Sequence, residues 1–360
     1  MSQKIPVTIV SGFLGAGKTT LINRILKEEH GEQIAVIINE FGEMGVDHQF
    51  VLDVEEEIYQ MDNGCLCCTL RTDIADMLKS ILMVREQNGI RVDRVLIETT
   101  GLADPAPLAQ TFINLPFLND NFIVDAVVTI VDAKNFLYQA RHQVEVAKQV
   151  GFADKILISK HSLVEEPVYH KVVQEVRSIN PFAAIQDMDA KPVTLKDIFD
   201  LQLFYASEEK ILQMEEASRE EEGCQHCGHH HDGENCNHDH HNKEHHHHHE
   251  HDHDHHHHSH HSGINSFVIE SDQALKLEDI NVWLNELIYI YGPELYRYKG
   301  ILNVQNVDYQ LIFQGVQMSF DISRGRDWKD SERKSTLVFI GKNLPEETLR
   351  ESFAACISQG

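Results

Sequence analysis

A glycine-rich segment near the start of the chain constrains the fold more than any other feature. It reads Gly12-Phe13-Leu14-Gly15-Ala16-Gly17-Lys18-Thr19, matches the pattern GxxxxGK[ST], and follows an apolar run over Ile5–Val10. Glycines let backbone N–H groups approach phosphates, and the positive end of the following helix dipole favours their charge. The pattern predicts a nucleoside triphosphate site. Its expected residues are Gly12, Gly15, Ala16, Gly17, Lys18, Thr19 and Thr20, with Lys18 on the β- and γ-phosphates and Thr19 on Mg²⁺.

Apolar runs and helical stretches alternate through the first 200 residues. The expected strands are Ile5–Val10, Ile34–Asn39, Arg94–Glu98, Ile123–Val131, Lys155–Ser159 and Ala183–Gln186. The expected helices are Lys18–Glu29, Thr69–Gln87, Lys134–Val150 and Glu166–Ile179. Strands that are apolar throughout are typical of a parallel sheet covered on both faces. We therefore expect a doubly wound α/β P-loop domain over residues 1–200, with a mostly parallel sheet.

Composition changes sharply after residue 200. Residues 201–262 are first rich in Glu and then in Cys and His, and 20 of the 25 histidines lie between His226 and His261. Residues 223–262 have almost nothing apolar to bury, which predicts disorder in the absence of metal. Imidazoles that are mostly neutral at pH 7 can bind Zn²⁺ or Ni²⁺, and their irregular spacing favours many weak sites. Cys224, His226 and Cys227 are candidates for one tighter accessory zinc site.

A second, smaller α+β domain is expected over residues 263–360. Its expected strands are Ser266–Glu270, Leu295–Val304, Tyr309–Gln314, Val316–Asp321 and Ser335–Ile340, and its expected helices are Gln273–Tyr291 and Pro345–Ile357. The apolar side chains Trp283, Leu284, Leu287 and Ile288 recur at helical spacing, which favours core over interface. We expect this domain to dock against either a client protein or the P-loop domain.

Two further segments are expected to complete the nucleotide site. Arg94–Glu98 runs into Thr99-Thr100-Gly101, where Glu98 would act through Mg²⁺ or orient the attacking water and Gly101 would sense the γ-phosphate. This makes Lys18 and Glu98 the catalytic candidates, although a strand-end carboxylate could also simply face solvent. After Lys155–Ser159 comes Ser159-Lys160-His161-Ser162, where a guanine-reading loop would be Asn-Lys-x-Asp. Lys160 can cover the base, but the Ser162 hydroxyl cannot accept two hydrogen bonds from guanine, so guanine preference stays a hypothesis.

Three cysteines within four residues point to metal. Cys65, Cys67 and Cys68 precede the helix expected from Thr69, whose N-terminus would lower thiol pKa values. Thiolates suit a soft tetrahedral ion such as Zn²⁺, and three protein ligands leave a fourth position open for exchange. Small thiols packing a loop are the alternative. Glu40 and Glu43 follow the second strand and could be metal ligands, position water, or be solvated loop acids.

Charge and the cysteine distribution limit the partners. Acidic residues outnumber basic ones by 57 to 31, a net charge of −26 that argues against nucleic acid or anionic membrane as partners. No apolar run approaches the roughly 20 residues of a membrane span, and the first residues do not read as a signal peptide. The seven cysteines, an odd number of which six fall in two clusters, favour reduced thiols used for metal. We therefore expect a cytoplasmic protein whose natural ligands are cations.

Several motifs together resemble the CobW family of metallochaperone GTPases. They are GFLGAGKTT, NEFGE, GCLCC, ETTGLADP, RYKGIL, FQGV and LVFIG. The resemblance implies a P-loop GTPase domain followed by a CobW C-terminal domain, with GTP, Mg²⁺ and Zn²⁺ as ligands. It implies GTP hydrolysis coupled to delivery of zinc, or in some branches cobalt, to a client protein. Two departures are Ser159 with Ser162 in the guanine loop, and Ile38 where some relatives carry an acidic residue.

Other functions remain open at this point. A zinc buffer would use its histidines as the functional part and its P-loop only to stabilise the fold. An ordinary nucleotide kinase is disfavoured, because no acceptor site accompanies the P-loop and the CxCC would be unexplained. The client protein, the metal used in the cell and a homo-oligomeric state are not determined by the sequence.

Overall fold

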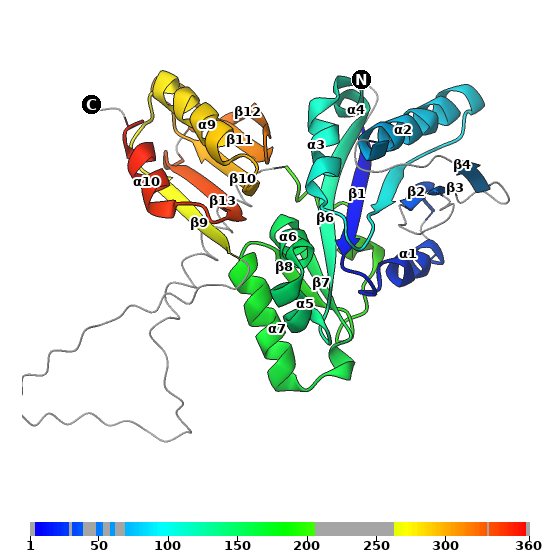
Figure 1. Cartoon of the computed structure of the whole chain (residues 1–360). Helices are drawn as coiled ribbons and strands as arrows, with labels where there is room; N and C mark the ends of the chain where they lie inside the picture. The colour runs from blue at the N-terminus through cyan, green and yellow to red at the C-terminus, as the bar shows by residue number, and fades with distance from the viewer. Residues whose placement is uncertain are drawn as a thin grey trace, which may run out of the picture.

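The computed structural model describes residues 4–28, 31–38, 48–52, 58–61, 69–205, 263–329 and 331–357 (Figure 1). They form an α/β domain and a smaller α+β domain that lie side by side. The α/β domain consists of β1 (Ile5–Gly12), α1 (Lys18–Leu26), β2 (Ile34–Ile38), β3 (His48–Leu52), β4 (Ile58–Met61), α2 (Thr69–Asn88), β5 (Arg94–Glu98), α3 (Ala106–Asn114), α4 (Pro116–Asn121), β6 (Phe122–Asp132), α5 (Phe136–His142), α6 (Val144–Phe152), β7 (Lys155–Ser159), α7 (Glu166–Ile179) and β8 (Ala184–Asp187).

One sheet in the order β4-β3-β2-β5-β1-β6-β7-β8 forms the centre of the α/β domain. The six strands β2, β5, β1, β6, β7 and β8 are parallel, and β3 and β4 extend the sheet by antiparallel pairing. The predicted doubly wound, mostly parallel fold is therefore confirmed. Because parallel strands end at one edge, Gly12, Glu98, Asp132, Ser159 and Asp187 all lie at the carboxyl edge of the sheet.

Both faces of this sheet are buried, as the apolar strands predict. Val7 and Ile9 pack with Leu78 of α2 and Phe112 of α3 on one face. Val10 lies on the other, in a core that α1 and residues 193–199 complete. A third core joins the β6 and β7 side chains to α5, α6 and α7. The helix layers keep water from the backbone of the central strands and leave the carboxyl edge to loops.

Several sequence expectations about this domain are corrected. The helix expected over Lys134–Val150 is two helices, separated at Gln143, whose backbone is extended (φ −127°, ψ 110°). Residues 141–144 are exposed, so the apolar stripe needed to seat one continuous helix is interrupted there. Helices α3 and α4 were not expected. The sequence signal for α3 is Asp104 with Pro105, because the Asp104 carboxylate accepts a hydrogen bond from the Ala106 N–H and Pro suits a helix start. For α4 the signal is Pro116, its first residue. Helix α1 ends at Leu26, short of Glu29.

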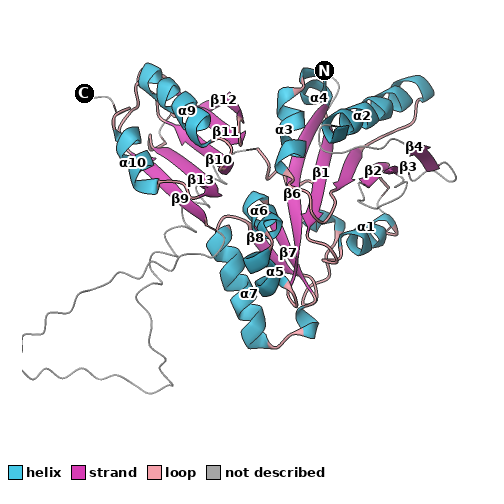
Figure 2. Cartoon of the chain, in the orientation of Figure 1, coloured by secondary structure: helices cyan, strands magenta, loops and turns pink. Residues whose placement is uncertain are grey.

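The second domain is a five-stranded antiparallel sheet with two helices packed against it (Figure 2). Its elements are β9 (Ile264–Ser271), α9 (Leu277–Tyr291), β10 (Leu295–Leu302), β11 (Tyr309–Val316), β12 (Ser319–Asp327), β13 (Ser335–Lys342) and α10 (Glu346–Ala354). The predicted α+β class is confirmed, and Trp283, Leu284, Leu287 and Ile288 are core residues as expected.

The bounds of several elements in this domain differ from the expectation by a few residues, and two of these differences have a clear local cause. Helix α9 begins at Leu277 instead of Gln273, because the Leu275 and Lys276 N–H groups already donate to the Asn303 and Cys356 carbonyls. The strand expected over Val316–Asp321 contains the turn between β11 and β12, where Gln317 has φ +50°. Among the described helices, none is both long and apolar enough to cross a membrane.

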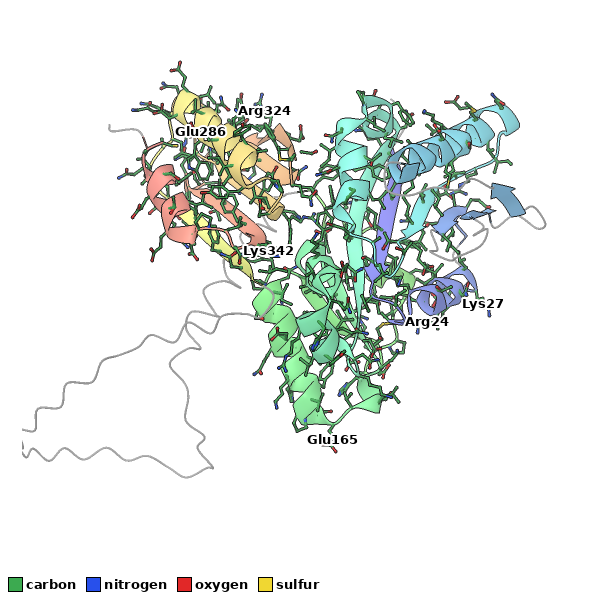
Figure 3. All side chains as sticks on the ribbon, viewed as in Figure 1. Arg24, Lys27, Glu165, Glu286, Arg324 and Lys342 are labelled. Carbon is green, nitrogen blue, oxygen red and sulfur yellow. The ribbon has the colours of Figure 1, made fainter. Side chains whose placement is uncertain are left out.

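The second domain docks against the first, which is one of the two expected arrangements. At this junction Arg297 and Lys299 of β10 contact Asp154, which immediately precedes β7, with N–O distances of 2.8 and 3.3 Å. All three side chains are at most 5% exposed. Lys342, at the end of β13, lies near the junction in Figure 3, whereas Glu165 lies at the far end of α7.

Candidate nucleotide and metal site

The P-loop connects β1 to α1 at the carboxyl edge of the sheet. Gly15 and Gly17 have positive φ angles of 73° and 107°, a conformation that favours glycine. The buried Lys18 ammonium donates to the Gly12 and Phe13 carbonyls at 2.8 and 3.2 Å. The lysine is therefore folded back over the loop, with its charge held where phosphates would enter. Ala16 is buried, and Thr20 faces solvent.

Close backbone contacts explain two glycines of the site. A Cβ on Gly12, whose φ is 140°, would lie 2.5 Å from the Ile130 carbonyl oxygen of β6. A Cβ on Gly101 would lie 2.6 Å from the backbone nitrogen of Leu14. The loop after β5 is thus packed directly on the P-loop, and a side chain at Gly101 would push the two segments apart.

Thr19 and Glu98 form the pair that the sequence predicts for Mg²⁺. The Thr19 hydroxyl donates to Glu98 Oε1 at 2.8 Å, although the two residues are 79 positions apart in the chain. Glu98 is only 4% exposed, so the alternative of a carboxylate facing solvent is wrong. A hydroxyl and a carboxylate oxygen beside a phosphate loop are hard donors of the kind Mg²⁺ prefers, so these residues fit the ion.

The base-reading loop is anchored to the P-loop. Lys160 has φ 61°, and its ammonium donates to the Gly15 carbonyl at 2.8 Å and to Asp132 Oδ2 at 2.7 Å. The hydroxyl of Ser159 donates to the Ala16 carbonyl at 2.8 Å. Burial raises the pKa of Asp132, but hydrogen bonds from Lys160 and Asn135 outweigh it, and the net shift is downward. Lys160 therefore links the base loop, the phosphate loop and β6 through an ion pair.

Two contributors were missed from the sequence. Asp132 ends β6 and holds Lys160, and a polar residue at the carboxyl end of a buried strand was an available signal. Gln149 is buried in α6, and its amide donates to the Gly101 and Ala103 carbonyls at 3.1 and 3.0 Å. It fixes the loop after β5 against the P-loop. Nothing in an amphipathic helical pattern singles out this glutamine.

The expected metal ligands lie outside the described residues. These are Glu40, Glu43, Cys65, Cys67, Cys68, Cys224, His226 and Cys227. Within the described part of the chain, no group of three or more Cys, His, Asp or Glu side chains could hold a metal ion. Ile38, where some relatives carry an acid, is half-buried at the end of β2 and packs against the core that includes Val36.

Fold and site together define a P-loop nucleotide-binding protein with an added antiparallel domain. Residues 6–187 match the profile described as "CobW/HypB/UreG, nucleotide-binding domain", and residues 264–357 match the "Cobalamin synthesis protein cobW C-terminal domain". The chain therefore belongs to the CobW/HypB/UreG family, which confirms the resemblance of its motifs.

Relatives cover nearly the whole chain. The "Zinc chaperone YjiA" of Escherichia coli is 34% identical over 97% of this chain and 98% of its own length. The "Zinc chaperone CobW" of Pseudomonas aeruginosa is 30% identical over 99% of this chain and 92% of its own length. A crystal structure of "Zn(II)-bound YjiA GTPase from E. coli" superposes with a TM-score of 0.74 at 30% identity, covering 99% of this chain and 100% of that one. The predicted enzyme class, a GTPase, is confirmed at the level of the family.

Proposed function

We propose that the protein is a GTP-hydrolysing zinc chaperone that binds Zn²⁺ through Cys65, Cys67 and Cys68 and transfers it to a client protein when GTP is hydrolysed. The observation that carries this proposal is the 34% identity, over 97% of the chain, to a protein named a zinc chaperone. The proposal has a nucleotide half, GTP hydrolysis, which the geometry of the P-loop site supports. Its metal half, zinc binding and transfer, is supported by the topology of the chain and by thiol chemistry.

For the nucleotide half, each described residue has a specific task. Lys18 exchanges its carbonyl partners for β- and γ-phosphate oxygens, which are stronger acceptors because they are charged. The Thr19 hydroxyl and Glu98 would hold Mg²⁺, which would supply positive charge against the negative charge of the phosphates. The alternative role for Glu98 is to orient the attacking water. Gln149 holds the Gly101 loop beside the P-loop, so that this loop meets the γ-phosphate.

For the metal half, the support is where the described strands end. β4 runs parallel to β2, because each pairs antiparallel with β3, so Met61 lies at the same carboxyl edge as Gly12. The chain passes from Met61 through the CxCC to α2 at Thr69. It likewise leaves β2 at Ile38, at this edge, and continues into Glu40 and Glu43. The segments that carry the thiols and both carboxylates therefore depart from the edge that carries the phosphate loop.

This arrangement supports a switch shared by metal and nucleotide. In such a switch, bound GTP would strengthen the hold of the three thiolates on zinc, and hydrolysis would weaken it so that the client's ligands take the ion. Coupling of this kind is reciprocal: Zn²⁺ raises GTP affinity by the same factor by which GTP raises Zn²⁺ affinity.

The test measures Zn²⁺ affinity by chelator competition, with and without Mg²⁺ and a non-hydrolysable GTP analogue. Protein lacking residues 223–262 keeps weak histidine sites from masking the thiolate site. We expect the analogue to tighten zinc binding about tenfold or more, a coupling of about 1.4 kcal/mol. The combined substitutions Cys65→Ser, Cys67→Ser and Cys68→Ser should remove both the thiolate zinc site and zinc-stimulated hydrolysis. Cys356→Ser, which replaces a buried thiol of the second domain, should leave both intact. Persistence of zinc stimulation without the three thiols would contradict the mechanism.

The composition of residues 223–262 supports a second candidate, a zinc buffer. It predicts that their deletion removes nearly all zinc capacity and that nucleotide leaves zinc affinity unchanged. A chaperone instead keeps its GTPase activity and its thiolate site after this deletion, so the same experiment separates the two. Cobalt delivery is distinguished by repeating the competition with Co²⁺.

A further inference from the structure

The guanine-reading loop of this chain lacks its carboxylate. Guanine presents two adjacent donors, N1–H and the N2 amino group, and a carboxylate can accept from both. At the position where this loop type carries that acid the chain has Ser162, whose single hydroxyl oxygen cannot reproduce the paired contact. A protein that prefers GTP therefore needs an acceptor from elsewhere.

The structure brings a carboxylate from another segment onto this serine. Asp189 Oδ2 accepts hydrogen bonds from the Ser162 N–H at 2.8 Å and from the Ser162 hydroxyl at 2.7 Å. Asp189 follows β8, the strand beside β7, so both residues lie at the carboxyl edge of the sheet. The carboxyl group missing from the loop at position 162 is thus present one hydrogen bond away.

The turn that carries Asp189 is held firmly. The Asp187 carboxylate accepts hydrogen bonds from the Asp189 and Ala190 N–H groups at 2.8 and 3.1 Å and also pairs with the His161 ring. The Met188 N–H donates to the Ile158 carbonyl of β7. The carboxylate is therefore positioned before any ligand arrives, which reduces the entropy lost on binding.

The Asp189 carboxylate can accept further hydrogen bonds. Its side chain is exposed, and among the described residues its two hydrogen-bond donors both meet Oδ2. A carboxylate offers about four acceptor positions over its two oxygens, so Oδ1 and part of Oδ2 remain for a ligand. Lys160, whose ammonium donates to the Gly15 carbonyl at 2.8 Å, connects this loop to the phosphate loop.

We propose that Asp189 is the guanine-specifying residue of this protein, accepting hydrogen bonds from N1–H and N2–H of GTP in place of the acid absent at position 162. Ser162 is a positioning residue that orients the carboxylate through its two hydrogen bonds. This inference rests on the proposed use of GTP and adds the residue that selects it.

The test compares binding of the β,γ-imido analogues of GTP, ATP and xanthosine triphosphate, each with Mg²⁺, by calorimetry on the full chain. Xanthine keeps N1–H but carries a carbonyl at C2, so it matches an amide that accepts once and donates once. We expect Asp189→Asn to lower the affinity for the GTP analogue about tenfold or more. The ratio of xanthosine-analogue affinity to GTP-analogue affinity should rise about a hundredfold, and the affinity for the ATP analogue should be nearly unchanged.

Two variants complete the design. Glu166→Gln removes a carboxylate that contacts the opposite side of His161, at 3.3 Å, and should leave the GTP preference intact. The exchange variant Ser162→Asp with Asp189→Ser returns the acid to the loop and should restore that preference. Unchanged affinity of the ATP analogue shows that each variant folds.

The outcomes separate this inference from the proposed function. If the wild-type protein prefers GTP and Asp189→Asn keeps that preference, Asp189 is not the selecting residue, while the GTPase proposal stands. If the wild-type protein does not distinguish GTP from ATP, both the inference and the guanine part of the proposed function fail.

Discussion

Buried cations lie both at the phosphate site and at the domain junction, but they contact different acceptors in the two places. At the phosphate site the Lys18 ammonium donates to the backbone carbonyls of Gly12 and Phe13. At the junction, Arg297 and Lys299 converge on the carboxylate Asp154, and they also donate to the Phe152, Phe204 and Leu203 carbonyls.

The partner decides what a buried cation can do. The Gly12 and Phe13 carbonyls that accept from Lys18 are weaker acceptors than a phosphate, so an incoming nucleotide can replace them. At the junction, the buried Asp154 carboxylate supplies a negative charge against Arg297 and Lys299 in addition to their carbonyl partners. Burial lowers the pKa of Arg297, and the Asp154 carboxylate opposes that shift. The phosphate site is thus suited to binding and the junction to joining domains, and four substitutions test this contrast.

The largest effect is expected at the junction. Asp154→Asn leaves two buried cations without their counter-charge, which should lower the free energy of unfolding by about 3–5 kcal/mol. Urea unfolding of the full chain measures it. The matched control is Asp104→Asn, which breaks a more exposed pair with Lys148 and should cost about 1 kcal/mol or less. Equal losses for the two variants would remove the distinction between the two places.

The phosphate site should respond in activity and not in stability. Lys18→Ala removes the cation that meets the developing phosphate charge, so kcat/KM for GTP should fall about 10²–10³-fold. Lys27→Ala, at the exposed far end of α1 (Figure 3), is the control and should retain activity. If the lysine acted as a structural ion like Arg297, the main loss would appear in unfolding instead.

Substitution of Asp132 should affect both stability and nucleotide binding, because this buried carboxylate pairs with the half-exposed Lys160 at the carboxyl edge of the sheet. Asp132→Asn should cost about 2 kcal/mol of stability and reduce the preference for GTP over ATP. Because the pKa of Asp132 is lowered in the folded state, its contribution is present above about pH 4 and is lost as pH falls through the lowered pKa. Unfolding curves for both proteins should therefore differ at pH 6 and converge in acid. A difference that persists in acid would assign the effect to packing.

The smallest effect concerns an uncharged contact of the junction. Gln110 of α3 donates to the Val316 carbonyl at 3.2 Å and to Gln317 Oε1 at 3.0 Å. Gln110→Ala should lower stability by about 1 kcal/mol, well below the loss at Asp154. Asn285→Ala, which removes an exposed bond within α9, serves as the control for amide loss. A loss as large as that of Asp154→Asn would show that charge is not what closes the junction.

The sequence was most informative where chemistry is local. The P-loop needs its glycines, Lys18 and Thr19 within eight consecutive residues, and strand Arg94–Glu98 places an acid at its own end, so both could be located without a structure. Helix boundaries were predicted less well, because the break at Gln143 depends on which side chains pack into the core of the folded domain. Asp132, Gln149 and Asp189 were missed, since each acts on a residue at least 27 positions away.

What the sequence alone determined is the kind of protein: a phosphate loop, a buried parallel sheet and a second α+β domain. These follow from short-range patterns, because the spacing of residues along a strand or loop is itself the constraint. Tertiary structure decided that Asp189 accepts hydrogen bonds from Ser162 and that Asp154 pairs with Arg297 and Lys299 at the domain junction. Such pairings join different strands and domains, and they exist only once the sheet order brings distant chain segments to the same edge.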